Sequence, residues 1–207
     1  MAALLPRLAV ALPRSGGLDP FSLFPDRLRR LALEIGFGGG EHLAVEAARH
    51  PETGFIGCEV FENGIARLIA RIEREGLENI RIFADDARLL LAALPPACLD
   101  RVCILFPDPW PKARHKKRRL ISTETLDRLA ASMADGAELR LATDDRDYLS
   151  HMLEAATGHP AFRWLARGPD DWRLRPDDWP PTRYEEKARA AGHMPAFLRF
   201  RRRPRGA

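Results

Sequence analysis

The sequence predicts an α/β fold in which a doubly wound, mostly parallel sheet carries helices on both faces. Short apolar segments typical of buried strands alternate with longer segments whose apolar residues recur at helical spacing. The clearest helix has apolar residues at i, i+3, i+4 and i+7, namely Ile65, Leu68, Ile69 and Ile72. Strands that alternate with helices form βαβ units, and such units build a parallel sheet.

The first two strand–helix units establish the pattern. An apolar strand is expected at 31–36, and a glycine-rich turn at 36–40 leads into a helix over 41–50 that Pro51 ends. A second strand is expected at 55–60, and the helix that follows it stops at Gly76. Glycine is common directly after a helix because it adopts the left-handed conformation without steric cost.

Three further units and two late strands complete the chain. Strands with their turns are expected at 79–87, 100–106 and 137–145, helices at 88–94, 126–133 and 148–156, and late strands at 162–166 and 196–203. A chain of 207 residues is long enough for one domain with a proper core. We therefore expect an irregular N-terminal arm over 1–30 and one folded domain over 31–207.

Composition favours a cytoplasmic protein of the ordinary globular kind. Hydrophobic residues make up 45% and charged residues 30%, and no apolar run approaches the roughly 20 residues of a membrane span. Prolines and arginines interrupt the apolar N-terminal segment, so a signal peptide is not predicted. The three cysteines are odd in number and lack CxxC spacing, which argues against disulfides and zinc sites.

The positive charge is concentrated in two places. The net charge is +4, yet 112–119 holds six lysines and arginines without an acid, and 199–207 holds five arginines without an acid. The rest of the chain is therefore net negative. Concentrated basic patches suggest a polyanionic partner such as nucleic acid, and a merely solubilising surface is an equally weighted alternative. For 199–205, a frayed tail is slightly favoured over a role in binding.

The stretch from 168 to 187 is rich in Pro, Asp and Trp and has no regular period. It contains a short repeat, PDDW, at 169–172 and again at 176–179. Twenty residues without structure are long for an inert connection. A substrate-binding loop is favoured over a disordered surface excursion, and the repeat itself has no further explanation.

Acidic residues follow the ends of the predicted strands. In doubly wound sheets, ligands bind beyond the carboxyl ends of the strands, so these residues are expected to line one edge. They are Glu34, Glu59, Asp85, Asp86, Asp108, Asp144 and Asp145.

The turn after the first strand has the pattern G-x-G-x-G, with Gly36, Gly38 and Gly40. A dinucleotide-binding fingerprint needs glycine at position 41, which is Glu41, and a P-loop needs a lysine there. Glu41 would repel a pyrophosphate, so the turn favours a less anionic cofactor. A purely structural strand-to-helix turn is the alternative.

Two strand-end acids fit a bound nucleoside. Glu59 is placed to accept hydrogen bonds from both ribose hydroxyls, and Asp86 is placed near an adenine amino group. The alternatives are an exposed strand-end acid for Glu59 and a helix N-cap for Asp86. With the glycine turn, these acids resemble the S-adenosyl-L-methionine pocket of Rossmann-like methyltransferases, a set that cofactor-binding synthases share.

The segment FPDPWP, residues 106–111, follows the fourth strand. Its prolines fix φ near −65° and are expected to keep the preceding residues extended, which makes a rigid corner that aims Asp108 into the cleft. A carboxylate beside the aromatic Trp110 suits guanine, because it can accept from N1–H and the 2-amino group while the ring stacks. The alternative is a stiff turn with a capping aspartate.

The cationic run follows this corner directly. Cations there would contact phosphates and give affinity that depends on salt and not on sequence. The run consists of Lys112, Arg114, His115, Lys116, Lys117, Arg118 and Arg119.

Together these segments resemble the bacterial tRNA (guanine-N7-)-methyltransferases, the TrmB family. The matching segments are LEIGFGGG, GCEV, FADDA, FPDPWPKARHKKRR, ATDD and TRYE, in the family's order and approximate spacing, from about Leu33 onward. The resemblance implies a Rossmann-like class I methyltransferase fold whose seventh strand is antiparallel. It also implies transfer of a methyl group from S-adenosyl-L-methionine to N7 of guanosine forty-six in the variable loop of tRNA.

The resemblance also implies roles for individual residues. By position, Glu34, Glu59, Asp86 and Asp108 match the family's cofactor-site acids, and Asp108 matches its proposed catalytic residue. Residues 114–119 match its RNA-contacting run. The substrate-contacting positions are matched by Lys112, Asp144, Thr182, Arg183, Tyr184 and Glu185. The basic N-terminal arm common in the family is shorter and less charged here.

Guanine N7 carries a lone pair and no proton, so the reaction needs orientation and electrostatics more than a base. We therefore expect Asp108 to anchor the guanine and to offset the positive charge that develops on it. The reaction gives no reason to expect a metal, although the edge carboxylates could bind a divalent cation. No obligate protein partner is inferred. A methyltransferase for proteins or small molecules and a non-catalytic RNA-binding module are the rival interpretations.

Overall fold

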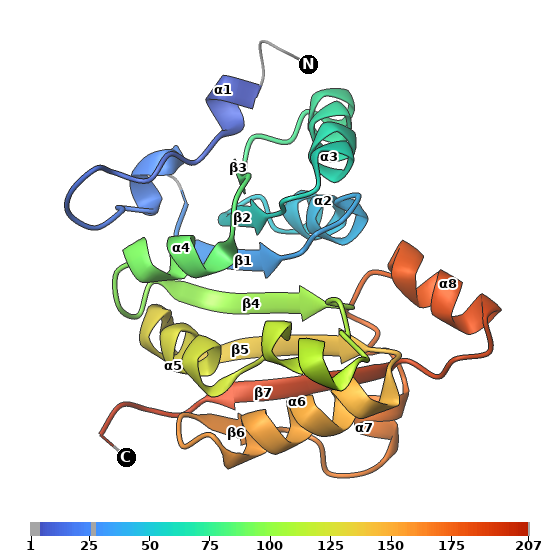
Figure 1. Ribbon diagram of the computed structural model, residues 1–207. Helices are drawn as coiled ribbons and strands as arrows, with labels where there is room; N and C mark the ends of the chain where they lie inside the picture. The colour runs from blue at the N-terminus through green and yellow to red at the C-terminus, as the bar shows by residue number, and fades with distance from the viewer. Residues whose placement is uncertain (1–4, 26–27, 207) are drawn as a thin grey trace.

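The computed structural model describes residues 5–25 and 28–206, and strands and helices alternate along the chain as predicted (Figure 1). Residues 1–4, 26, 27 and 207 lie outside this description, as do the parts of the predicted arm and domain that fall on them. A seven-stranded sheet with the order β3-β2-β1-β4-β5-β7-β6 forms the centre. The doubly wound α/β fold is confirmed.

Each strand overlaps its predicted segment, although β5 begins at Met133, which was predicted to end the preceding helix. The strands are β1 (Arg30–Ile35), β2 (Thr53–Cys58), β3 (Ile80–Phe83), β4 (Leu99–Leu105), β5 (Met133–Thr143), β6 (Phe162–Trp164) and β7 (Ala196–Arg202). Strands β1 to β5 pair in parallel, whereas β7 is antiparallel to both β5 and β6. The antiparallel seventh strand that the family resemblance implied is therefore present.

Helices α2 to α6 occupy the predicted connections, and further helical segments lie in the N-terminal arm, in the cationic run and in the late loop. In chain order the helices are α1 (Leu5–Leu8), the 3₁₀ turn η1 (Phe21–Leu23), α2 (Glu41–Arg49), α3 (Glu62–Glu75), α4 (Ala87–Ala93), the 3₁₀ segment η2 (Ala113–Arg118), α5 (Thr123–Ser132), α6 (Arg146–Gly158), α7 (Asp170–Arg173) and α8 (Arg183–Ala190). Gly76 caps α3 in the left-handed conformation, as its position in the sequence predicts.

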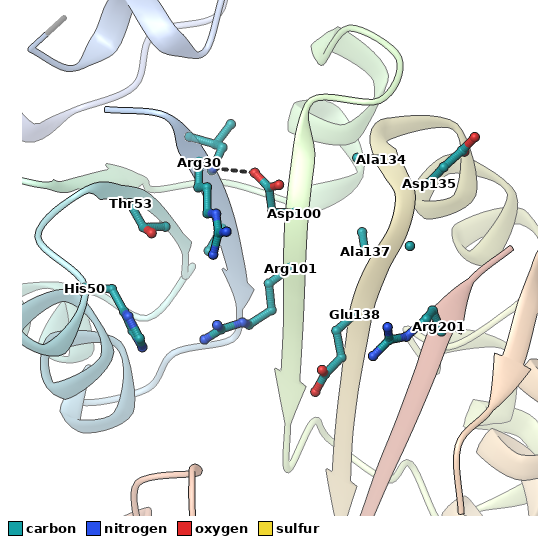
Figure 2. A pocket seen from close by; sticks show the side chains of 13 residues that line it. Arg30, His50, Thr53, Asp100, Arg101, Ala134, Asp135, Ala137, Glu138 and Arg201 are labelled. Atoms are coloured by element: carbon teal, nitrogen blue, oxygen red, sulfur yellow. Dashed lines mark hydrogen bonds between the residues drawn. The ribbon is translucent and has the colours of Figure 1, made fainter. Parts of the chain in front are cut away.

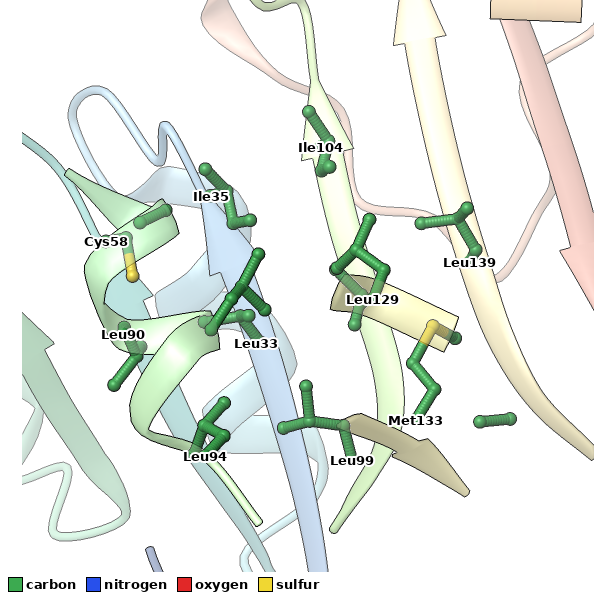
Figure 3. Close-up of a cluster of buried hydrophobic side chains, with 14 of the residues drawn as sticks. Leu33, Ile35, Cys58, Leu90, Leu94, Leu99, Ile104, Leu129, Met133 and Leu139 are labelled. Carbon is green, nitrogen blue, oxygen red and sulfur yellow. The ribbon is translucent and has the colours of Figure 1, made fainter. Parts of the chain in front are cut away.

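Both faces of the sheet are covered by an apolar layer. Helices α2 and α3 pack on one face, and α4, α5 and α6 pack on the other. Figure 3 shows part of the second layer, in which Leu33 of β1, Leu90 of α4 and Leu129 of α5 are almost completely buried. Each such leucine contributes about 1.5–3 kcal/mol on burial, so these layers hold the strand ends in fixed positions.

The N-terminal arm packs against the sheet. Ala9 forms a β-bridge with Ile82, and the Val10 amide donates to the Ile82 carbonyl at 2.8 Å. Val10, Leu18 and Phe24 are buried in the core. The arm thus covers part of β3, the strand at one edge of the sheet, where unpaired backbone groups would otherwise face solvent.

The C-terminal arginines are docked, so the prediction of a frayed tail is wrong. Arg202 is buried and donates to Asp135 at 3.1 Å. Arg205 donates to the carbonyls of Ala131 and Met133 at 2.8 and 2.7 Å. The physical reason is that the last carbonyls of a helix lack partners within the helix, and these arginines supply donors at the end of α5.

Candidate active site

A cavity of about 510 Å³ opens at the carboxyl ends of β1, β2 and β4. This edge is where the sheet order places a ligand site, because β1 connects onward to β2 on one side while β4 lies on its other side. The sequence-predicted residues among its lining are Gly36, Gly38, Glu59, Asp108, Arg118 and Tyr184. Groups from five separate segments of the chain therefore meet in one place.

The glycine turn is held in a conformation that other residues rarely adopt. Gly36, Gly38 and Gly40 have φ of 75°, 56° and 76°, all in the left-handed region. The Gly38 amide donates to Glu59 Oε2 at 2.8 Å. A β-carbon at Gly64 would lie 2.2 Å from the Gly38 carbonyl oxygen, so α3 approaches the turn too closely for any side chain there.

Glu59 organises the end of β2 as well as the turn. Its Oε1 accepts from the amides of Val60 and Phe61 at 2.8 and 3.0 Å, while Oε2 accepts from Gly38. A carboxylate oxygen accepts two hydrogen bonds, so Oε2 retains capacity toward the cavity. Glu59 is therefore placed to accept from a ligand hydroxyl at the rim.

Three of the predicted cofactor residues do not line this cavity. Glu34 is buried and Oε2 lies 2.6 Å from Nδ1 of the buried His42, so it supports the start of α2. Gly40 faces Leu68, which lies 2.6 Å from a β-carbon built at position 40. Asp86 also lies outside the cavity lining.

Asp86 is the N-cap of α4. Its Oδ1 accepts from the Arg88 amide at 2.9 Å, and Oδ2 lies 2.6 Å from Arg88 Nη2. The Arg88 side chain lowers the pKa of the Asp86 carboxyl. The capping interpretation is confirmed by this geometry, and contact between Asp86 and an adenine remains a prediction.

The corner after β4 differs from its predicted conformation. Phe106 and Trp110 each precede a proline, yet their φ values are 54° and 45°. The prediction of extended geometry is wrong for both residues, because tertiary contacts override the local preference. The Phe106 amide donates to Ala142 at 2.8 Å, and its ring meets Phe197 edge-on at 6.5 Å. Asp108 lies exposed between these strained residues, and no described residue donates a hydrogen bond to its carboxylate.

Some residues of the cationic run are exposed to solvent, whereas others form ion pairs or are buried. Lys112, Arg114 and Lys117 are exposed in and before η2. Lys116 Nζ lies 2.8 Å from Asp147. Arg119 is buried and pairs with Asp147, and its predicted contact with RNA stays a prediction.

Two members of the run contact Trp110. The guanidinium of Arg118 lies 4.9 Å from the Trp110 ring centroid, and the His115 ring meets that indole edge-on at 5.8 Å. Cations stack favourably on tryptophan, so these contacts fix the indole beside Asp108.

The residues near the end of the chain that are predicted to contact substrate lie in different surroundings. Asp144 lies 2.9 Å from His193 Nδ1, away from the cavity lining. The Thr182 hydroxyl caps α8 by accepting from the Glu185 amide at 3.0 Å. Arg183 is exposed, and Glu185 is buried in ion pairs with arginines of the same region. Within the described residues of this group, Tyr184 is the one that lines the cavity.

The stretch 168–187 is an ordered element anchored by its second PDDW copy. Trp179 is 1% exposed and packs edge-on against Phe197 at 5.9 Å. Arg140 lies 5.1 Å from the Trp179 ring centroid and 2.6 Å from Asp178. The first copy forms α7, where Trp172 is half-buried against the core. The repeat therefore anchors the chain that leads to Tyr184.

Sequence reasoning missed two cavity residues, Val60 and Phe61. They are 69% and 61% exposed and line the cavity directly after Glu59. Exposed apolar side chains beside polar groups are typical of ligand sites. Their position immediately after a strand-end acid was the signal that could have identified them.

A second cavity, of about 280 Å³, lies at the opposite, amino end of the strands. Figure 2 shows Arg30, Arg101 and Arg201 around it, with Asp100 accepting a hydrogen bond from the Leu31 amide at 2.9 Å. None of the predicted site residues lines it. Among residues 5–25 and 28–206, no group of three or more His, Cys, Asp or Glu side chains could hold a metal ion. That part of the chain also has no helix long and apolar enough to cross a membrane.

Comparison with solved structures agrees with the fold. The rRNA methylase of Streptococcus thermophilus aligns with a TM-score of 0.58 at 14% identity, over 85% of this chain and 88% of that one. The 16S rRNA methyltransferase KamB aligns with a TM-score of 0.60 at 17% identity, over 92% and 96%. A 16S rRNA methyltransferase of Catenulisporales acidiphilia, solved with its cosubstrate SAM, aligns with a TM-score of 0.58 at 16% identity, over 86% and 87%. These likenesses establish a class I methyltransferase fold.

Comparison of sequences identifies the family, whereas comparison of structures gives only the fold. The model of the family described as "Putative methyltransferase" matches residues 29–197. The tRNA (guanine-N(7)-)-methyltransferase of Rhodospirillum rubrum is 54% identical over 99% of this chain and 81% of its own length. The protein of the same name from Paramagnetospirillum magneticum is 50% identical, over 98% and 85%. The chain therefore belongs to the bacterial tRNA (guanine-N(7)-)-methyltransferase family.

Proposed function

We propose that the protein transfers a methyl group from S-adenosyl-L-methionine to N7 of guanosine forty-six in the variable loop of tRNA. The observation that carries the proposal is the single cavity in which the glycine turn and Glu59 face Asp108 and Trp110. Relatives at 54% and 50% identity bear the name tRNA (guanine-N(7)-)-methyltransferase, which supports the activity. The proposal places the enzyme in the cytoplasm with tRNA as its partner.

The cavity residues fit the methyl donor. Gly36 and Gly38 bring backbone to the rim, Glu59 offers a carboxylate to the ribose hydroxyls, and Val60 and Phe61 offer apolar surface to a base. The cavity volume of about 510 Å³ lies within the range of small-molecule sites. When bound, S-adenosyl-L-methionine supplies an electrophilic methyl group on a positively charged sulfur.

The corner after β4 fits the acceptor base. Asp108 is exposed at the cavity and accepts no hydrogen bond from a described residue, so its carboxylate is available to a guanine edge. Trp110 lies beside it and is held by Arg118. The carboxylate also offsets the positive charge that methylation places on the base, and it does so without removing a proton.

The exposed members of the cationic run complete the substrate surface. Lys112, Arg114 and Lys117 are exposed next to the corner, where they can contact phosphates. Such contacts bring the RNA to the cavity and make its affinity fall with salt.

A nucleoside assay tests the proposal. The purified protein is incubated with S-adenosyl-L-methionine and an unmodified tRNA transcript, and the digested RNA is analysed by mass spectrometry. We expect 7-methylguanosine from the natural transcript and none from a transcript in which guanosine forty-six is replaced by adenosine. A natural transcript without 7-methylguanosine refutes the activity, and equal product from both transcripts refutes the position.

A further inference from the structure

We infer that Arg119 and Asp147 form a positioning pair that holds the corner bearing Asp108 and Trp110, and that Arg119 is not an RNA contact. This inference rests on the proposed function, because it concerns the geometry that the methyl transfer needs. It separates one member of the cationic run from the rest on structural grounds.

The surroundings of Arg119 are those of a structural residue. It is 5% exposed although charged neighbours in the run are open to solvent. Its Nε donates to the Pro109 carbonyl at 2.9 Å, and its Nη2 pairs with the Asp147 carboxylate. The guanidinium also lies 4.8 Å from the ring centroid of Tyr148, which is fully buried. A phosphate could reach this guanidinium only if the corner were displaced.

The corner needs such support because it makes few bonds of its own. Prolines at 107, 109 and 111 have no amide hydrogen to donate. Residues 107–111 form no backbone–backbone hydrogen bond with any residue that the structure describes. The flanking Phe106 and Trp110 have positive φ, and each such non-glycine residue costs about 1–3 kcal/mol. A strained segment with few bonds persists only where its surroundings fix it.

The bond to Pro109 is placed where it controls the site. Pro109 lies between Asp108 and Trp110 in the chain, and its carbonyl belongs to the peptide unit that leads to Trp110, so the bond fixes that unit directly. The ring of Pro109 restricts φ and so couples this unit to the one that follows Asp108. Asp147 stands in the first turn of α6, a helix packed on the core. Arg119 therefore connects the corner to a rigid element.

This geometry requires arginine and not merely a positive charge. The planar guanidinium satisfies a carbonyl with Nε and a carboxylate with Nη2 while its face stacks on Tyr148. Lysine has a single ammonium group and cannot make these three contacts at once. At a simple phosphate contact, lysine would serve nearly as well as arginine. Replacement of Arg119 by lysine therefore separates the two roles.

The experiment compares Arg119→Lys and Asp147→Asn with Lys117→Gln, an exposed member of the same run. For each variant, kcat and KM for tRNA, the salt dependence of tRNA binding and the affinity for S-adenosyl-L-methionine are measured beside the wild type. We expect Arg119→Lys to lower kcat on the order of 10- to 100-fold, because small misplacements of reacting groups have effects of this size. Its slope of log affinity against log salt is expected to stay at the wild-type value.

Lys117→Gln is expected to behave in the opposite way in the binding assay. It weakens tRNA binding and reduces the salt slope by about one, as loss of a phosphate contact does. Asp147→Asn is expected to lower kcat like Arg119→Lys, and the double variant is expected to be no worse than the poorer single variant. Unchanged cofactor affinity shows that the variants are folded.

Two outcomes overturn the inference. One is Arg119→Lys with wild-type kcat, and the other is Arg119→Lys with a salt slope reduced like that of Lys117→Gln. If Arg119→Lys does not fold, the kcat of Asp147→Asn, at the exposed end of the pair, is compared with that of the wild type instead. An unchanged kcat then overturns the inference. A wild type that forms no 7-methylguanosine removes the proposed function and this inference with it, whereas an active wild type with an equally active Asp147→Asn variant overturns only the inference.

Discussion

The ring of Tyr184 lies over Gly38 so closely that a β-carbon at Gly38 would be 2.9 Å from Tyr184 Cε2. Gly38 belongs to the turn after β1, and Tyr184 belongs to α8 near the end of the chain. Both residues line the candidate cavity. The late segment therefore closes one wall of the site directly on the glycine turn.

This closeness predicts that Gly38→Ala weakens binding of S-adenosyl-L-methionine. Alanine at φ of 56° carries strain of about 1–2 kcal/mol, and its β-carbon would also displace Tyr184. Because each 1.4 kcal/mol changes affinity about tenfold, we expect a loss of about tenfold or more by isothermal titration calorimetry. The control is Gly76→Ala, which has φ of 64° and open space around its β-carbon. It should lower stability without changing cofactor affinity, and equal losses in both variants would contradict the prediction.

The two copies of PDDW are predicted to differ in their contribution to stability. Trp179 is 1% exposed, so Trp179→Ala should lower the free energy of unfolding by about 3–5 kcal/mol. Trp172 is only half-buried, so Trp172→Ala should cost clearly less. Urea denaturation of both variants checks this order. The reverse order would show that the first copy, and not the second, anchors the loop.

The sheet and helices could be predicted from the sequence because their signals are local. The isoleucines of α3 recur at helical spacing, and Gly76 ends the helix where a left-handed residue is needed. The edge on which ligand residues gather followed from topology alone, and Glu59 and Asp108 lie there as predicted. The spacing of apolar residues and the order of the strands therefore locate the candidate site.

What could not be predicted depends on contacts between distant segments. Nothing local distinguishes Arg119 from the exposed cations beside it, because its burial depends on Asp147 and Tyr148 of α6. Likewise, Glu34 lies just before the end of β1 and pairs with His42, a contact that depends on the packing of α2, while cofactor binding by Glu34 stays a prediction. In both cases the chemical type of the residue is evident from the sequence, whereas the side chain that it contacts is not.

The Asp147 carboxylate is predicted to stabilise the fold in a defined pH range. Hydrogen bonds from Lys116 and Arg119 lower its pKa from 3.8 to about 2. Because the folded pKa lies below the unfolded one, this stabilisation is complete above about pH 4 and is lost as the pH falls to about 2.

The measurement is the difference in free energy of unfolding between wild type and Asp147→Asn across pH. We expect this difference to be constant near neutral pH and to shrink between about pH 4 and pH 2. An NMR titration of the Asp147 carboxyl provides a direct check. A difference that persists unchanged at pH 2 would show that the charge of Asp147 does not contribute.

Asp108→Asn tests whether Asp108 contributes to catalysis through its charge, as proposed. Asparagine keeps the shape and one acceptor oxygen but cannot offset positive charge on the methylated base. We expect kcat to fall on the order of 10- to 100-fold, while affinities for cofactor and tRNA change little. The control is Asp85→Asn, an exposed acid outside the cavity lining whose Oδ1 accepts from the next amide at 2.7 Å.

The pH dependence of kcat in the same experiment separates charge from proton transfer. If Asp108 acts by charge, the wild-type rate does not change with pH between neutral and mildly alkaline conditions, and the Asn variant is slower by a constant factor over that range. A general base would instead give the variant a rate that rises with pH as hydroxide takes over the proton. Since guanine N7 has no proton to lose, we expect the constant factor, and full activity of Asp108→Asn would exclude the electrostatic role altogether.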